Sequence, residues 1–146
     1  MNEVRLAETD SEIAACYPVM AQLRPQVGEE SFLPRVRAQM DRGYRLACVR
    51  DGEGTVVALA GFRIGLSLSW GTYLYVDDLI TDSGRRSQGF GARLLRWLMD
   101  YGARQGCGQL HLDSGMQRED AHRFYAREGM ARAAYHFSIA LEPPQF

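Results

Sequence analysis

The chain has 146 residues, 46% of them hydrophobic and 24% charged, with a formal net charge of −1 and a sequence pI near 6.3. These values predict a single domain over residues 1–146 that buries its own core, and they exclude the basic footprint of a nucleic-acid-binding protein. No apolar run approaches the roughly 18 residues of a membrane span, and MNEVRLAETD is no signal peptide, so we expect a cytoplasmic protein without nucleic-acid or membrane partners.

The three cysteines, Cys16, Cys48 and Cys107, are widely spaced and odd in number. No CxxC or HExxH spacing is present, so the sequence indicates neither a disulfide framework nor a zinc site. We expect reduced, mostly buried thiols and no bound metal.

The first half of the chain predicts a strand, two helices and a strand hairpin. Residues 2–8 alternate as a short strand, Asp10-Ser11 offers a helix cap, and Pro25 ends the helix that follows. A second helix is expected over about 29–42. Strands at 44–50 and 56–65 flank the turn DGEG.

The second half alternates strands with helices. Residues 72–81 form a strand rich in β-branched and aromatic residues, followed by a helix that ends near 105. A strand at 107–113, a helix at about 118–128 and a strand at roughly 132–141 complete the order β-α-α-β-β-β-α-β-α-β. The predicted fold class is α/β (α+β), with a mostly antiparallel central sheet flanked by helices.

Residues 85–95, RRSQGFGARLL, place two glycines at the start of a helix. A helix N-terminus exposes unpaired N–H groups that attract anions, and glycine lets a phosphate approach them. The alternative is a tight turn that merely needs Gly89 and Gly91. A Walker loop is excluded because no lysine follows. A dinucleotide fold fits poorly because too little chain follows Asp113 for further βα units.

Arg86 to Gly91 match the pattern [R/Q]-x-x-G-x-[G/A], the pyrophosphate loop of the GNAT superfamily of acetyl-CoA-dependent N-acetyltransferases. Further along, AHRFYAREGM resembles the second landmark of that superfamily, A-x-x-x-Y-x-x-x-G-[FM]. Ala121, Tyr125, Gly129 and Met130 stand at its defined positions. The chain therefore resembles a GNAT acetyltransferase, firmly over residues 44–131 and by element order before that.

The resemblance implies where acetyl-CoA, the co-substrate, would bind. Backbone N–H groups would hold its pyrophosphate, and the strand before the loop would pair with its pantetheine arm, with an N–H near Leu79 facing the thioester oxygen. The residues so implied are Leu79, Ile80, Thr81, Arg86, Ser87, Gln88, Gly89, Phe90, Gly91 and Ala92. Thr81 departs from the β-branched aliphatic residue of most relatives, and Arg118 from their Asn.

The resemblance also implies catalytic roles. Tyr125 is placed like the family's general acid, which protonates the departing thiolate; the alternative is a core aromatic beside Phe124. For the base, strand alternation puts Asp77 on one face with Tyr75 and Leu79. It puts Asp78 on the other face with Val76 and Ile80. Some relatives have a catalytic acid at the position of Tyr75 and others at that of Asp77. We expect Asp77 to accept the amine proton, although a structural ion pair with an arginine is an equal alternative.

The predicted function is acetyl transfer to a primary amine by direct attack in a ternary complex. The alternatives are a non-catalytic GNAT-fold module that binds coenzyme A and a nucleotide-binding regulator. The acceptor, a small molecule or a peptide or protein amine, cannot be read from the sequence. We interpret the alternating pair His111 and Asp113, and His136, as structural, whereas His122 could border the cleft. The stretch after Gly129 is short for the usual two closing strands. The alternatives are that one long strand ends the sheet, or that a partner subunit of a homodimer supplies a strand.

Overall fold

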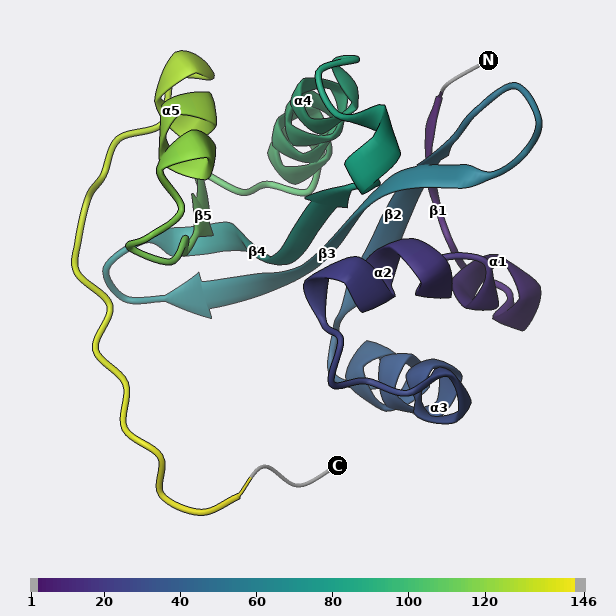
Figure 1. Ribbon diagram of the computed structural model, residues 1–146. Coiled ribbons are helices and arrows are strands. Elements are labelled where there is room, and N and C mark those ends of the chain that lie inside the picture. The colour runs from purple at the N-terminus through teal and green to yellow at the C-terminus, as the bar shows by residue number, and fades with distance from the viewer. Residues whose placement is uncertain (1–2, 144–146) are drawn as a thin grey trace. The chain divides into compact units, whose positions relative to one another are not determined.

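A five-stranded sheet forms the centre of the fold in a computed structural model that describes residues 3–143. The strands lie in the order β1 to β5, and each neighbouring pair is antiparallel except β4 and β5, which are parallel (Figure 1). Their bounds are Val4–Leu6 (β1), Arg45–Arg50 (β2), Val56–Ser67 (β3), Gly71–Thr81 (β4) and Gln109–Leu112 (β5). The predicted α/β class and mostly antiparallel sheet are confirmed.

Helices cover both faces of the sheet (Figure 1). On one face lie α1 (Asp10–Ala14), α2 (Tyr17–Leu23) and α3 (Glu29–Met40), and on the other lies α4 (Phe90–Arg104). Because strand side chains alternate between the two faces, the sheet contributes side chains to two apolar clusters. The first includes Ile13, Cys16, Phe32, Tyr44, Cys48 and Leu59, and the second includes Ala60, Phe62, Leu74, Val76, Phe90 and Leu94.

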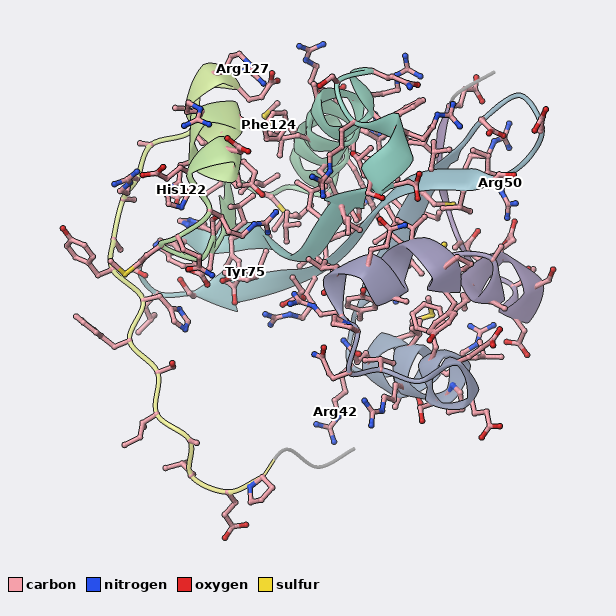
Figure 2. The ribbon with its side chains drawn as sticks, viewed as in Figure 1. Arg42, Arg50, Tyr75, His122, Phe124 and Arg127 are labelled. Carbon is pink, nitrogen blue, oxygen red and sulfur yellow. The ribbon has the colours of Figure 1, made fainter. Side chains whose placement is uncertain are left out.

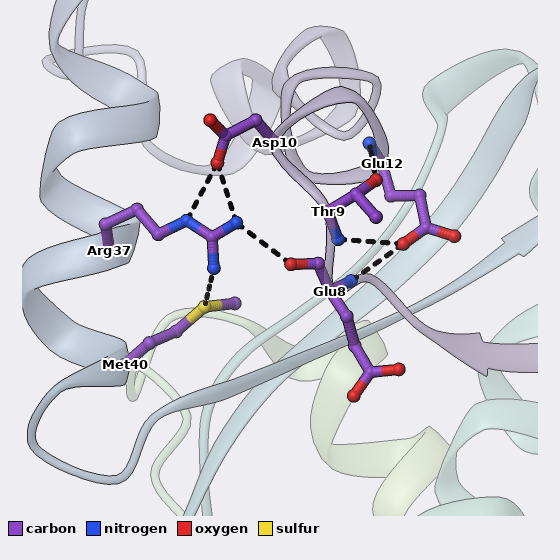
Figure 3. A network of polar contacts seen from close by, with 6 residues as sticks. All are labelled: Glu8, Thr9, Asp10, Glu12, Arg37 and Met40. Carbon is purple, nitrogen blue, oxygen red and sulfur yellow. Dashed lines mark hydrogen bonds and ion pairs between the residues drawn. The ribbon is translucent and has the colours of Figure 1, made fainter.

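The N-terminal helical region differs from its prediction in two ways. It is broken into α1 and α2 rather than continuous, and its cap is Thr9 instead of Asp10-Ser11. The Thr9 hydroxyl accepts from the Glu12 N–H at 3.1 Å, and the Glu12 carboxylate accepts from the Thr9 N–H at 2.9 Å (Figure 3). This capping box leaves Asp10 free to accept two hydrogen bonds from Arg37 of α3.

The chain divides into two compact units, Met1–Leu112 and Asp113–Phe146. The first holds the whole sheet with α1 to α4, and the second holds α5 (Glu119–Arg127). In the described part of the chain, no helix is long and apolar enough to cross a membrane.

The strand predicted at 132–141 is wrong. Residues 130–140 have no regular secondary structure, and their large apolar side chains Tyr135, Phe137 and Ile139 are at least 80% exposed. A strand is stable only when a neighbour satisfies its backbone groups. The described part of the second unit contains no other strand, so this unit offers none.

Candidate functional site

Strands β4 and β5 pair over only part of their length. Tyr73 to Val76 pair with Gln109 to Leu112, after which β5 ends while β4 continues to Thr81. Among the described residues, no strand pairs with 77–81 on this side. Backbone N–H and C=O groups on that edge can therefore receive an extended ligand as an added strand.

A β-bulge lies where the two strands part. Gly61 of β3 is opposite Asp78, whereas its neighbour Phe62 is opposite Val76, so Asp77 is the additional residue. The bulge changes the alternation: Leu79 packs with Val76 on the α4 side, and Ile80 packs on the opposite side. The expectation that Leu79 lies opposite Val76, based on uninterrupted alternation, is wrong for this reason.

The two carboxylates at the bulge are held by different arginines. Arg63 donates two hydrogen bonds to Asp77, at 2.7 and 2.9 Å, and lies over the ring of Tyr75, a residue labelled in Figure 2. Arg24, in the connection after α2, donates to Asp78 at 2.9 Å and also to the carbonyl oxygen of Asp77. The hydrogen bonds to Asp77 raise the pKa of Arg63, so the guanidinium keeps its charge.

Tyr44 completes the contacts of Asp78. Its buried hydroxyl donates to the second oxygen of Asp78 at 2.8 Å. Burial and the negative charge of Asp78 raise the pKa of Tyr44 well above its usual value, so the phenol keeps its proton. Neither Tyr44 nor Arg24 was singled out from the sequence, because only the folded sheet brings these distant positions together.

A loop connects β4 to α4 and is anchored at its start. The side chain of Asp82 accepts from the Gly84 N–H at 3.1 Å and from Gln22 of α2 at 2.6 Å. Arg85, next in the loop, pairs with Asp51 at 2.9 Å, and this bond lowers the pKa of Asp51. Arg85 is therefore occupied by a structural ion pair.

The loop then turns through two residues with positive φ, Ser87 at 66° and Gly89 at 84°. Such a φ is costly for a serine, and strain of this kind gathers at ligand sites. Gly89 is the N-cap of α4, and no side chain in the described part of the chain caps this helix. The N–H groups of Phe90, Gly91 and Ala92 consequently lack intrahelical acceptors. Arg86, Ser87, Gln88 and Gly89 are exposed around this terminus.

Tyr125 belongs to α5, in the second unit. Its ring lies 5.3 Å from that of Phe124, and burial raises the pKa of its hydroxyl while Arg118 opposes the shift. The phenol is thus protonated at neutral pH, as a proton donor must be.

The histidines have structural contacts. His111 stacks on Trp70 with ring centroids 3.5 Å apart and contacts the Gln109 side chain at 2.7 Å. His122 contacts the carbonyl oxygen of Gly115 at 2.8 Å, and His136 lies 3.3 Å from Asp113. The structural interpretation of His111 agrees with these contacts, although His136 stands outside any strand.

Comparisons with known proteins agree on one family. A family model described as the acetyltransferase (GNAT) family matches residues 8–130. An uncharacterized N-acetyltransferase of Bacillus subtilis (strain 168), YhdJ, is 34% identical over 86% of this chain and 88% of its own. The aminoalkylphosphonate N-acetyltransferase of Salmonella typhimurium (strain LT2) is 27% identical over 95% of this chain and 91% of its own. The aminoglycoside N-acetyltransferase AAC(6')-Iy, solved in complex with CoA, has the same fold at 11% identity, with a TM-score of 0.79 over 96% of this chain and 95% of its own.

Proposed function

Since the chain belongs to the acetyltransferase (GNAT) family and is an acyltransferase, we propose that it transfers the acetyl group of acetyl-CoA to a primary amine. The amine attacks directly, in a complex that holds both substrates. One observation carries this proposal: within the described residues, β4 has no strand partner on one edge over 77–81, and the loop that follows leads to an α4 N-terminus with no side-chain cap.

The geometry of the loop fits a pyrophosphate. A helix terminus contributes only about 0.3 to 1 kcal/mol toward an exposed anion, so several aligned N–H groups are needed. The backbone from Arg86 to Ala92 supplies them. Apart from Gly89 itself and its chain neighbours, no heavy atom of the described residues lies within 4 Å of the position that a Cβ on Gly89 would take. The exposed Arg86 can add a charge-assisted bond.

The edge of β4 fits an extended arm. Leu79, Ile80 and Thr81 would hold the pantetheine portion through backbone hydrogen bonds, and the Leu79 N–H would donate to the thioester oxygen. Acetyl-CoA, when bound, supplies an acetyl group activated as a thioester. This chain aligns the arm and stabilises the charge that develops on the oxygen.

Two side chains complete the proposed chemistry. An alkylamine is protonated at neutral pH, and Asp77, directly or through a water, would accept its proton before the attack. Tyr125 would donate a proton to the departing sulfur, which its burial-raised pKa permits. Its assignment rests on the A-x-x-x-Y-x-x-x-G-[FM] motif.

The acceptor is proposed to be a small cationic amine. Asp77, the more exposed of the two acids at the bulge, would attract an ammonium group, and the Salmonella relative takes its name from an aminoalkylphosphonate. A panel for testing therefore includes aminoalkylphosphonates, polyamines, aminoglycosides and a peptide N-terminus, with thiol release from acetyl-CoA as the readout. Release with one class of amine supports the proposal, and coenzyme A binding without release on any amine contradicts it.

Gly89→Val tests the coenzyme site. It adds a branched side chain at φ 84°, where backbone strain and bulk both prevent the loop from meeting a phosphate. Gly54→Val is the matched control, because Gly54 has φ 83° and equally open surroundings in the hairpin between β2 and β3. We expect Gly89→Val to weaken coenzyme A binding by about tenfold or more, since charged hydrogen bonds contribute roughly 1.5 to 3 kcal/mol each. Equal affinity in both variants would overturn the assignment.

A further inference from the structure

Arg24 contacts β4 at the bulge from a backbone position that is itself fixed. It is the C-cap of α2: its N–H donates to the Met20 carbonyl oxygen at 2.8 Å, and its carbonyl oxygen accepts from the Val27 N–H at 3.0 Å. From there its guanidinium donates to the Asp78 carboxylate and to the Asp77 carbonyl oxygen, each at 2.9 Å. Because the second bond is made to a main-chain oxygen, Arg24 holds the backbone of the bulge as well as a side chain.

Gln22, two residues earlier in α2, contacts the chain just after β4. Its side-chain amide donates to the Asp82 carboxylate at 2.6 Å and accepts from the Ser83 N–H at 2.9 Å. Asp82 also accepts from the Gly84 N–H at 3.1 Å, so the amide is connected to several successive positions of the chain. Gln22 therefore fixes the place where β4 ends and the loop to α4 begins.

The segment between these two contacts packs on the same helical layer. Ile80 of β4 contacts the apolar cluster to which Val19 and Met20 of α2 belong. In the part of the chain that the structure describes, residues 77–81 have a strand partner only in β3. An edge without a second partner needs other contacts to keep its shape, and an edge that is already shaped loses less conformational freedom when an extended ligand binds to it.

We propose that Gln22 and Arg24 are positioning residues for the transfer of the acetyl group. Arg24 holds the bulge, and with it Asp77 and the Leu79 N–H, at the thioester end of acetyl-CoA. Gln22 holds the start of the loop, at the pyrophosphate end. Each acts through the backbone that it fixes. This inference rests on the proposed function, and it gives α2, which lies outside both sequence motifs, a part in aligning the coenzyme.

The two positions predict different kinetic effects. Arg24→Gln shortens the side chain and removes the guanidinium, while Asp78 still accepts from Tyr44 at 2.8 Å. We expect kcat to fall by about tenfold or more, because the base and the oxyanion donor lose their alignment, with coenzyme A affinity nearly unchanged. Gln22→Ala should instead weaken coenzyme A binding by about two- to tenfold, the effect of a typical hydrogen bond, with kcat nearly unchanged.

Arg37→Gln is the matched control for Arg24→Gln. Arg37 also donates to an aspartate, Asp10, and to a backbone carbonyl oxygen, that of Glu8 (Figure 3). Its side chain is 43% exposed, against 41% for Arg24. These bonds join α3 to the start of α1, away from β4. Arg37→Gln should therefore shift the urea midpoint about as much as Arg24→Gln does, while kcat and coenzyme A affinity stay at their wild-type values.

Hydrogen exchange of the free, full-length protein gives a readout that needs neither coenzyme nor amine. The amides of residues 77–83 should exchange about two- to tenfold faster in Arg24→Gln and in Gln22→Ala than in Arg37→Gln. Equal exchange in the three variants, or equal losses of kcat and of coenzyme A affinity in all three, would overturn the positioning roles alone if the wild type binds coenzyme A and acetylates an amine. A wild type that does not bind coenzyme A would overturn the proposed function, and this inference with it.

Discussion

Asp77 and Asp78 are neighbours in the chain with different surroundings. Their contacts and exposure indicate which of the two can act as a base and which has a structural role. The Asp77 carboxylate accepts from Arg63, Arg24 reaches only the Asp77 backbone carbonyl, and 26% of the Asp77 side chain is exposed. Asp78 is 12% exposed and is held by both Arg24 and Tyr44. A carboxylate must be free to receive a proton, so Asp77 is the better candidate and Arg63 is the group that restrains it.

We therefore expect a large loss of activity from one substitution in the Asp77–Arg63 pair and a small loss from the other. Asp77→Asn should lower kcat by roughly a hundredfold, the lower end of the range for acid–base groups. Arg63→Gln should keep most of the activity, because it removes the restraint and leaves the carboxylate in place. The measurement is the pH profile of kcat for both variants. Equal losses in the two would mean that the ion pair only supports the bulge.

The hydroxyl of Tyr125, the proposed general acid, can be tested by a single substitution. Replacing it with phenylalanine removes the donor but keeps the ring beside Phe124, so folding should be almost unchanged. We expect kcat to fall by about a hundredfold, since a thiolate with a pKa near 8.5 is already a tolerable leaving group. Because burial raises its pKa, Tyr125 keeps its proton until well into the alkaline range, and activity should decline only there. An unchanged kcat in Tyr125→Phe would remove the acid role.

Among the elements, β4 shows what the sequence could and could not predict. Its position at 72–81 followed from β-branched and aromatic residues. The helix predicted to end near 105 is α4, which ends at Arg104 and buries Leu94, Leu95 and Leu98. The bulge at Asp77 has no such local pattern, since the extra residue depends on how β3 pairs with β4. The face assignments of Leu79 and Val76 failed for that reason.

Gly61 of β3 lies opposite Asp78 at the bulge, and a substitution there tests how tightly the two strands pack against Tyr44. A Cβ there would lie 1.8 Å from the Tyr44 hydroxyl oxygen and 2.7 Å from Asp78, and the buried Tyr44 cannot move aside. Gly61→Ala should therefore cost about 1 to 3 kcal/mol of unfolding free energy. Gly65→Ala is the control, because the three atoms nearest to its Cβ all belong to the ring end of Tyr73, which is half-buried and can turn away. In urea denaturation, Gly61→Ala should unfold at a clearly lower midpoint than Gly65→Ala. Equal midpoints would contradict a rigid Tyr44–Asp78 contact.

At the scale of the whole molecule, the two units differ in how their backbones are satisfied. The first builds a sheet with a helical layer on each face, whereas the second ends in residues 130–143, which contain no helix or strand. The alternation of Tyr135, Phe137 and Ile139 predicted a strand. An alternating pattern indicates that a segment can form a strand, but it does not identify the neighbouring strand with which it must pair. Whether a partner strand is present depends on the fold, which no local pattern encodes.

Exposed, irregular backbone is where proteases cut first. Brief trypsin treatment should therefore cleave after Arg132 before it cleaves inside any helix or strand, because Arg132 is exposed and lies in the irregular segment. Mass spectrometry of the first product should show a fragment that ends at this residue, and chymotrypsin should cut after Tyr135 or Phe137 on the same time scale. Arg132→Gln is the matched variant, in which the first tryptic cut should be delayed while the chymotryptic cuts persist. Resistance of this segment to both enzymes, with cleavage elsewhere, would mean that residues 132–141 pair as a strand in solution, as their alternation predicts.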